Sequence, residues 1–295
     1  MPPAAPTLTW PVVGAVLCGA LLHAGWNTLV KSSNDKPLDT ALVHTMGALA
    51  VLPFALLLGL PSRDALPYLL LSSVIHVGYY AALAGAYQNG ELGMTYPIMR
   101  GFAPLLVVLG SASVVGEVPG LATWIGVLAI TLGVALVGLA HPGRARHHGK
   151  ALAYAFANAA IIAVYTFVDG LGARTEQQAS AMVLRYVLWL SVLDGIVYPL
   201  LLWRRRPPGQ RADALAYARA RWPLAVLGGL ASIASYAIAL WAMTRAPVAS
   251  VAALRETSVL FGALLGMLLL RERAGPQRML GTLAVVAGVM ALKLG

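Results

Sequence analysis

The sequence has few charged residues and a single cysteine. Charged residues make up 11% of its 295 positions, whereas soluble domains carry about 25%, so the composition excludes an ordinary soluble protein. Cys18 has no second cysteine with which to form an internal disulfide, and its apolar neighbours are those of an ordinary helix residue. The nucleotide-binding pattern GxxxxGK[ST] is absent, which excludes ATP bound by that loop as the energy source.

Hydrophobic residues are abundant instead, at 59% of the chain, and the mean hydropathy is +0.76. They form runs of about 20 residues, the length of helix that crosses a bilayer core. The runs lack the period-2 alternation of barrel strands, and helices satisfy their own backbone groups in lipid. No Lys or Arg precedes the first run, so we expect a retained helix and not a signal peptide. The sequence thus predicts an all-α membrane protein with ten transmembrane helices, at 10–31, 38–60, 65–87, 93–115, 119–140, 149–170, 178–202, 222–244, 248–270 and 275–294.

The net charge of +10 is concentrated in the predicted loops, so we expect no nucleic-acid partner. One side of the predicted bundle carries only four basic residues: Arg63, Arg174, Arg245 and Lys293. The other side carries Lys31, Lys36, Arg144, Arg146, Lys150, Arg204, Arg205, Arg206, Arg211, Arg219, Arg221, Arg271, Arg273 and Arg278. Because Lys and Arg concentrate on the cytoplasmic side, we expect both termini to face outward.

The two halves of the chain resemble each other at a nearly constant offset. Arg100 aligns with Arg255 at an offset of 155, and glutamates and glycines that follow align in the same register. Each half contains five predicted spans, an odd number, so the second half enters the membrane in the opposite sense. We therefore expect a 5+5 inverted repeat, with residues 1–140 and 149–295 as its halves. This architecture is typical of transporters that hold a substrate between two halves.

These features resemble the drug/metabolite transporter superfamily, in its ten-helix EamA branch, over essentially the whole chain. The resemblance is carried by two hairpins, Gly116-Glu117 and Arg271-Glu272, each followed by a glycine-rich span. It is also carried by HAGWNTLVKSSNDK (23–36), YPIMRGFAPLL (96–106) and ALRETSVLFGALLG (253–266). It implies a secondary transporter of a bacterial inner membrane, without cofactor or metal. It does not imply one substrate, because members move very different compounds. Relatives often keep both termini in the cytoplasm, and the charge pattern here departs from that.

Arg100 and Arg255 are candidate substrate-binding residues because ionisable residues inside spans are costly and usually functional. Each lies about seven residues, or roughly 10 Å, into its span, counted from opposite faces, so the two bracket the midplane. Arginine keeps its charge and requires a negative partner. The spans offer three carboxylates: Glu256, Asp169 and Asp194. Together with Arg185 this makes three arginines against three carboxylates, a balance that favours a zwitterion or a carboxylate-bearing metabolite over a lone cation. The alternative for the arginines is a structural ion pair.

Polar and aromatic residues interrupt the first span at His23, Trp26 and Asn27, which share one helix face. The family resemblance implies that this helix borders the central cavity. There Trp26 would close over a ligand, and Asn27 would both donate and accept hydrogen bonds. Hydrogen bonding between helices is the alternative interpretation.

Three tyrosines complete the expected site. Tyr80 lies four residues after His76 on the third span, and Tyr236 is its counterpart on the eighth. Tyr96 lies four residues before Arg100 and shares its face. The two prolines that flank this arginine are expected to loosen its helix and free carbonyl groups for the site.

Residues that can change charge inside the bundle are candidates for proton coupling; for His76 the favoured alternative is a histidine that only makes hydrogen bonds. Histidine titrates near neutral pH, and burial alters the protonation of carboxylates. The candidates are His76, Glu256, Asp169 and Asp194. His44 has no polar companion at helical spacing and is interpreted as structural.

Two further patterns are interpreted as elements of the fold. Glu117 and Glu272 are expected near helix N-termini, where a carboxylate complements the helix dipole. Small residues around Gly133 and Gly288 are expected to form a packing seam between the last helices of the two halves.

The leading hypothesis is a secondary transporter that works by alternating access, with export slightly favoured over import and proton coupling as one candidate energy source. Its substrate is expected to be a small zwitterionic or anionic metabolite: amino-acid-like, an organic acid, or a phosphorylated or phosphonate compound. Its only other partner is the lipid bilayer, and we expect a monomer, with a dimer as the alternative. A flippase for a lipid with an anionic headgroup is the second hypothesis. The third is an intramembrane enzyme, but HExxH and GxSxG motifs are absent.

Overall fold

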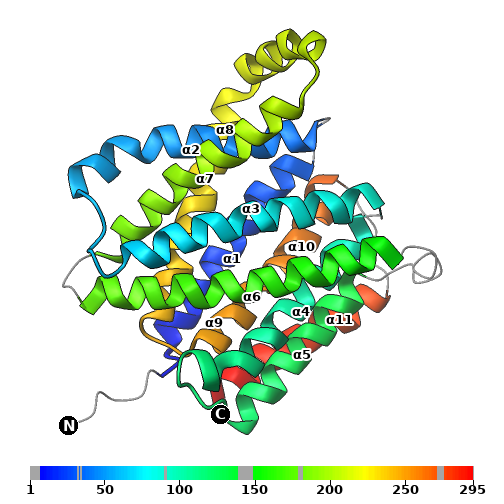
Figure 1. Ribbon diagram of the computed structural model, residues 1–295. Coiled ribbons are helices and arrows are strands. Elements are labelled where there is room, and N and C mark those ends of the chain that lie inside the picture. The colour runs from blue at the N-terminus through cyan, green and yellow to red at the C-terminus, as the bar shows by residue number, and fades with distance from the viewer. Residues whose placement is uncertain are drawn as a thin grey trace.

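The computed structural model describes residues 7–31, 33, 35–89, 92–138, 149–178, 182–270 and 276–294. Within these ranges the chain is helical and contains no strand. In chain order the helices are α1 (Trp10–Lys31), α2 (Lys36–Leu58), α3 (Leu66–Asn89), α4 (Leu92–Val114), α5 (Leu121–Gly138), α6 (Gly149–Gln178), α7 (Val183–Arg205), the short 3₁₀ helix η2 (Pro208–Gln210), α8 (Arg211–Met243), α9 (Val248–Arg255), α10 (Ser258–Leu270) and α11 (Pro276–Leu294) (Figure 1). The Arg271-Glu272 hairpin and the basic residues Arg144 and Arg146 lie outside the described residues.

Eight helical segments of the described chain are long and apolar enough to cross a membrane, and α5 and α11 are shorter apolar helices. Together these ten segments match the ten spans predicted from the sequence, and the all-helical membrane fold is confirmed. The beginning of α1 lies beside the end of α11, because the Lys293 ammonium lies 5.2 Å from the centroid of the Trp10 ring. This contact agrees with an even number of crossings, which places both ends on the same side of the membrane.

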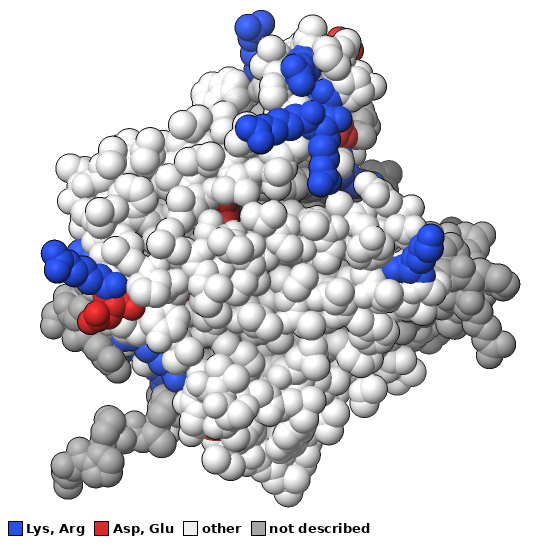
Figure 2. All heavy atoms as spheres, in the orientation of Figure 1, with Lys and Arg blue, Asp and Glu red and all other residues white. Residues whose placement is uncertain are grey.

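The surface of the bundle is largely apolar, as expected of a protein that is solvated by lipid. Large apolar side chains such as Leu57, Val74 and Leu109 are exposed. Figure 2 shows that Lys and Arg lie at the margins of the face in view, most densely where α7 and α8 project beyond the rest of the bundle. Charged groups therefore gather at the ends of helices, where they reach water.

The structure changes the predicted bounds of the eighth span. We expected a helix over 222–244, but α8 begins at Arg211 and has 33 residues. At about 1.5 Å per residue, this helix is longer than a bilayer core of about 30 Å, which explains its projection. Its first turns pack against α2, where Ala214 is buried with Leu38 and Leu42. The polar residues before 222 thus belong to a helix and not to a loop.

The ninth span, predicted as one helix over 248–270, is broken into α9 and α10 at Glu256 and Thr257. The amide of Thr257 donates to the carbonyl of Leu254, and the amide of Leu260 donates to that of Thr257. These hydrogen bonds to the carbonyl three residues earlier replace the α-helical bonds to the carbonyl four residues earlier. The Thr257 hydroxyl also donates to the Leu254 carbonyl at 2.7 Å, a local bond that competes with regular helix.

In the first half the expected loosening around Arg100 is not found, because α4 runs without a break from Leu92 to Val114. Pro97 and Pro104 lie inside this helix. Proline removes one N–H donor but leaves the remaining helical bonds in place. The interruption therefore lies beside the second arginine, in a segment that contains no proline.

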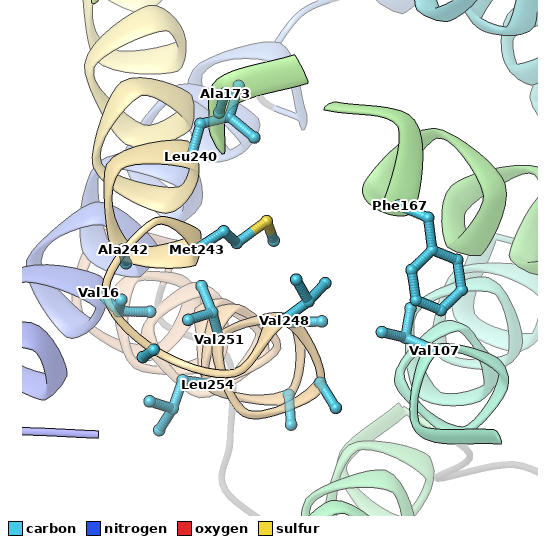
Figure 3. Packing of buried hydrophobic residues seen from close by; sticks show 14 of the residues in the cluster. Val16, Val107, Phe167, Ala173, Leu240, Ala242, Met243, Val248, Val251 and Leu254 are labelled. Atoms are coloured by element: carbon cyan, nitrogen blue, oxygen red, sulfur yellow. The ribbon is translucent and has the colours of Figure 1, made fainter. Parts of the chain in front are cut away.

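The main hydrophobic core surrounds α9. Val248, Val251 and Leu254 of this helix are fully buried, and they face side chains from α1, α4, α6 and α8 (Figure 3). Residues at the end of α9 are thereby held at the centre of the bundle. This packing positions the arginine and glutamate that follow.

Helix pairs hold the bundle together: α5 packs against α11, α2 against α7, α1 against α8, and α3 against α6. The predicted glycine seam is confirmed between α5 and α11. A Cβ atom on Gly133 would lie 2.6 Å from the carbonyl oxygen of Gly281, and one on Gly288 would lie 2.7 Å from that of Gly126. Only glycine permits so close an approach of the two backbones.

Candidate functional site

Arg100 and Glu256 form an ion pair at the centre of the bundle. Nε of Arg100 lies 2.9 Å from Oε2 of Glu256, and the two residues are 7% and 4% exposed. The arginine comes from the middle of α4, and the glutamate from the break after α9. Each charge thus offsets the other by electrostatic attraction, although Nε and Oε2 make no hydrogen bond of normal geometry among the described residues.

Arg255 lies beside this pair but has a different partner. It is the last residue of α9, and its guanidinium lies 5.1 Å from the centroid of the Tyr236 ring. No carboxylate of the described chain lies within ion-pair distance of it. The ring supplies a cation–π contact but no compensating charge. Arg100, Glu256 and Arg255 together therefore carry a net charge of +1.

Two adjoining pockets are both lined by Arg100 and Arg255, and their free volumes are only about 0 and 10 Å³. His23 and Ser235 line the first, and Pro104 the second. Sites for small molecules usually measure about 300–1,000 Å³, so the bundle is closed around the arginines in this conformation.

The predicted face of α1 divides between the pocket and an aromatic cluster. His23 reaches the pocket, and its ring also meets Trp26 edge-on at 5.3 Å. The Trp26 ring also contacts that of His44, with centroids 6.3 Å apart. Its indole Nε1 is buried without a hydrogen-bond partner among the described residues. Asn27 donates to the carbonyl of His23 at 2.8 Å, so its amide bonds within α1.

Tyr80 and Tyr96 have different neighbours. Tyr80 stacks on Tyr198 with centroids 4.3 Å apart, and its hydroxyl lies 3.4 Å from Nε2 of His44. His44, interpreted as structural for want of companions, therefore lies within an aromatic cluster. Tyr96 packs with Met99 in the smaller core between α4 and α6.

Asp169 is fully buried on α6 and accepts hydrogen bonds from two tyrosines. Tyr186 of α7 donates to Oδ1 at 2.8 Å, and Tyr236 of α8 donates to Oδ2. Two hydroxyl donors supply hydrogen bonds to this carboxylate without an ion pair. Asp169 is therefore not a direct partner of the arginines.

His76 and Asp194 form a second polar pair between α3 and α7. Nδ1 of His76 lies 3.2 Å from Oδ2 of Asp194, and the centroid of the Tyr165 ring lies 4.7 Å from that of His76. The four proton-coupling candidates thus fall into three places: Glu256 with Arg100, Asp169 between two tyrosines, and Asp194 with His76.

Comparison with known proteins identifies the family. The sequence profile of the EamA-like transporter family matches residues 10–139 and 149–294. The chain belongs to this family, within the drug/metabolite transporter superfamily. No curated protein matches the chain. One solved structure, described only as a crystal structure of a protein, is 19% identical and covers 96% of this chain and 95% of its own length, with a TM-score of 0.73. That likeness supports the fold alone.

This EamA-like transporter is accordingly a multi-pass integral membrane protein of a transporter family. It also contains an ion pair that was not predicted from the sequence. Arg185 lies 2.6 Å from Glu176, whose second oxygen accepts the backbone N–H of Ser62 at 2.8 Å. Arg185 therefore does not belong to the group around Arg100, and the balance of three arginines against three carboxylates does not describe one site.

Some residues of the central region were missed because they carry no charge motif. Tyr165, Tyr186 and Tyr198 each contact a predicted candidate. They lie on α6 and α7, and no helical spacing links them to their partners on α3 and α6. An excess of tyrosine over phenylalanine, 11 against 5, is the one signal that could have drawn attention to them.

Proposed function

We propose that the chain is a secondary transporter that moves a small carboxylate-bearing or phosphate-bearing metabolite, zwitterionic or anionic, by alternating access. The observation that carries this proposal is the unequal state of the two central arginines. The charge of Arg100 is offset by Glu256, whereas Arg255 has no ion-pair partner in the described part of the chain and lies over the ring of Tyr236. Because a planar guanidinium binds carboxylate or phosphate through paired hydrogen bonds, Arg255 is the group that a substrate anion would contact.

Alternating access is supported by the way the helices pair. The proposed halves are residues 1–140 and 149–295, related as an inverted 5+5 repeat. Under that relation α5 corresponds to α11 and α2 to α7, and each packs on its counterpart. The contacts α1–α8 and α3–α6 then map onto each other. Transporters of this construction rock one half against the other around a site near the midplane.

Coupling to protons is proposed for the pair of His76 and Asp194, neither of which contacts Arg100 or Arg255 directly within the described structure. Histidine is the side chain whose ordinary titration range includes physiological pH. Asp194 at 3.2 Å stabilises its charged form by electrostatic attraction. A proton bound here from water on one side of the membrane would be released to water on the other side.

The orientation proposed for the chain places the basic ends of α7 and α8 in the cytoplasm. Arg204 and Arg205 end α7, and Arg219 lies in the projecting part of α8. These residues extend past the span itself, where the positive-inside preference applies. Both termini then face outward.

The proposal is tested by a thermal-shift screen of the purified protein in detergent, against amino acids, dicarboxylates, inorganic phosphate, phosphonates and organic cations. A ligand that binds the folded state raises the unfolding temperature by mass action. We expect a carboxylate or phosphate compound to stabilise the wild type and to lose its effect on Arg255→Gln.

Arg245→Gln is the matched control, because Arg245 also lies over an aromatic ring, 5.0 Å from the centroid of Trp241, but is exposed away from the pockets. Its variant should respond to the compound as the wild type does. Stabilisation by organic cations alone would contradict the proposal and would make Glu256, Asp169 and Asp194 the binding groups.

A further inference from the structure

Tyr236 lies between the arginine site and the buried acidic groups and contacts both. The face of its ring receives the guanidinium of Arg255 at 5.1 Å. Its hydroxyl donates a hydrogen bond to Oδ2 of Asp169. The same ring packs against both the main core around α9 and the smaller core between α4 and α6. A shift of this side chain would therefore change its contacts with both Arg255 and Asp169.

Asp169 lies one helical turn after Tyr165 on α6, and the centroid of the Tyr165 ring lies 4.7 Å from that of His76, so Asp169 and His76 are close enough to interact electrostatically. Titratable and charged groups surround His76 from every neighbouring helix that contributes one: His44 from α2, Tyr79 and Tyr80 from α3, Tyr165 and Asp169 from α6, Asp194 from α7 and Arg255 from α9. Among the acidic groups of this set, the carboxylate of Asp169 is the one that accepts a hydrogen bond from Tyr236. A change at Asp169 alters the field that His76 experiences.

We propose that Tyr236 is the coupling residue of this transporter, the side chain through which a ligand at Arg255 changes the hydrogen bonding of Asp169 and, with it, proton binding at Asp169 and His76. This inference rests on the proposed function and extends it. A ligand carboxylate that engages Arg255 draws the guanidinium from the ring, and the hydroxyl then loses its fixed direction toward Asp169. Proton binding changes only N–H or O–H bonds, with water as donor on one side of the membrane and as acceptor on the other.

The coupling must act in both directions, because an effect of ligand on proton binding requires an equal effect of pH on ligand affinity. Typical couplings change affinity by about 5–150-fold. The pH dependence of ligand binding is therefore a direct measure of the contact, and a merely structural role for Tyr236 would not produce it.

Tyr236→Phe tests the inference because it keeps the ring beneath Arg255 and removes only the hydroxyl. Tyr186→Phe is the matched control, since it removes the other hydroxyl donor of the same Asp169 carboxylate but has no contact with Arg255. Affinity would be measured by thermal shift, over a range of ligand concentrations, for the compounds of the screen: amino acids, dicarboxylates, phosphonates and inorganic phosphate. The measurement would be made on both sides of the histidine titration range, at about pH 6 and about pH 8.

We expect the wild-type affinity to change by about fivefold or more between the two pH values. Tyr186→Phe should keep a change of that size, although its midpoint moves. Tyr236→Phe should bind the ligand but show a change below about twofold.

An unaltered pH dependence in Tyr236→Phe, or an equal loss in both variants, would overturn the inference and leave the arginine site standing. Failure of every compound to stabilise the wild type would remove the proposed function and this inference together.

Discussion

The carboxylate of Glu117 accepts a hydrogen bond from the backbone N–H of Val248 at 2.8 Å. Val248 is the first residue of α9, so a side chain from the connection between α4 and α5 caps a helix of the opposite half. Glu117 also pairs with Arg174, whose Nε donates to the carbonyl of Met243 at 2.8 Å. These contacts fix the start of the short helix that ends at Arg255.

Glu117→Ala is expected to destabilise the protein. Loss of a helix cap costs about 1 kcal/mol, and the unpaired, largely buried charge of Arg174 adds about 1–3 kcal/mol. Glu117→Gln keeps an acceptor for the Val248 N–H and should lose less. Unfolding temperatures in detergent would rank the wild type above Gln and Gln above Ala, whereas equal temperatures for all three would show that the cap is dispensable.

Arg100 and Arg255 should differ in what their removal does to stability. Arg100→Ala leaves Glu256 buried without a partner, a change that costs about 3–5 kcal/mol. Arg255→Ala removes a cation–π contact of about 0.5–2 kcal/mol. The double variant Arg100→Met/Glu256→Leu should recover most of the lost stability, as measured by thermal unfolding. Equal losses for the two single variants would argue against the assigned pairing.

The seam between α5 and α11 predicts a strong effect for a very small change. Gly133→Ala places a methyl group 2.6 Å from the carbonyl oxygen of Gly281, so the helices must move apart. Gly14→Ala is the control, because nothing lies within 4 Å of its added Cβ and it is likewise inside a helix. We expect Gly133→Ala to lower the unfolding temperature and Gly14→Ala to leave it unchanged or raise it slightly.

Proton coupling through His76 and Asp194 predicts a separation of two activities. Asp194→Asn and His76→Gln should still exchange a bound compound across a membrane but should not accumulate it when only a pH gradient is applied. Both activities would be followed with labelled compound in proteoliposomes. Accumulation at wild-type level in both variants would place the coupling elsewhere.

The orientation can be tested with single cysteines. In a Cys18→Ala background, Gly209→Cys lies on the exposed turn between α7 and α8 and Arg63→Cys in the connection between α2 and α3. We expect a membrane-impermeant thiol reagent applied to intact cells to label the second cysteine and not the first. The reverse pattern would place the basic ends of α7 and α8 outside.

The sequence was sufficient to predict ten apolar helical segments and to single out the two central arginines, but not the bounds of the eighth span or the break in the ninth. Apolar runs of bilayer length indicate where helices cross, and Arg100 and Arg255, which align at an offset of 155, stand out in a sparsely charged interior. The pairing of Arg100 with Glu256 was among the expected possibilities. These features depend on composition and spacing along single segments, which a sequence displays directly.

The remaining features depend on contacts between segments that the sequence does not relate. The break after Arg255 arises from short-range hydrogen bonds around Thr257 in a segment as apolar as its unbroken counterpart. Glu117 was expected near a helix N-terminus, and it does cap one, but that helix belongs to the other half. The bond from Tyr186 to Asp169 crosses from α7 to α6, and no periodicity predicts it.

Counterflow in proteoliposomes tests the central claim most directly. Vesicles loaded with a compound that stabilises the wild type would be diluted into a trace of the labelled compound, with no gradient of protons and no ATP. We predict transient accumulation of unchanged label by the wild type and by Arg245→Gln, and none by Arg255→Gln. Equal accumulation by Arg255→Gln, or recovery of the label as a chemically altered product, would contradict a transporter that holds its substrate at Arg255.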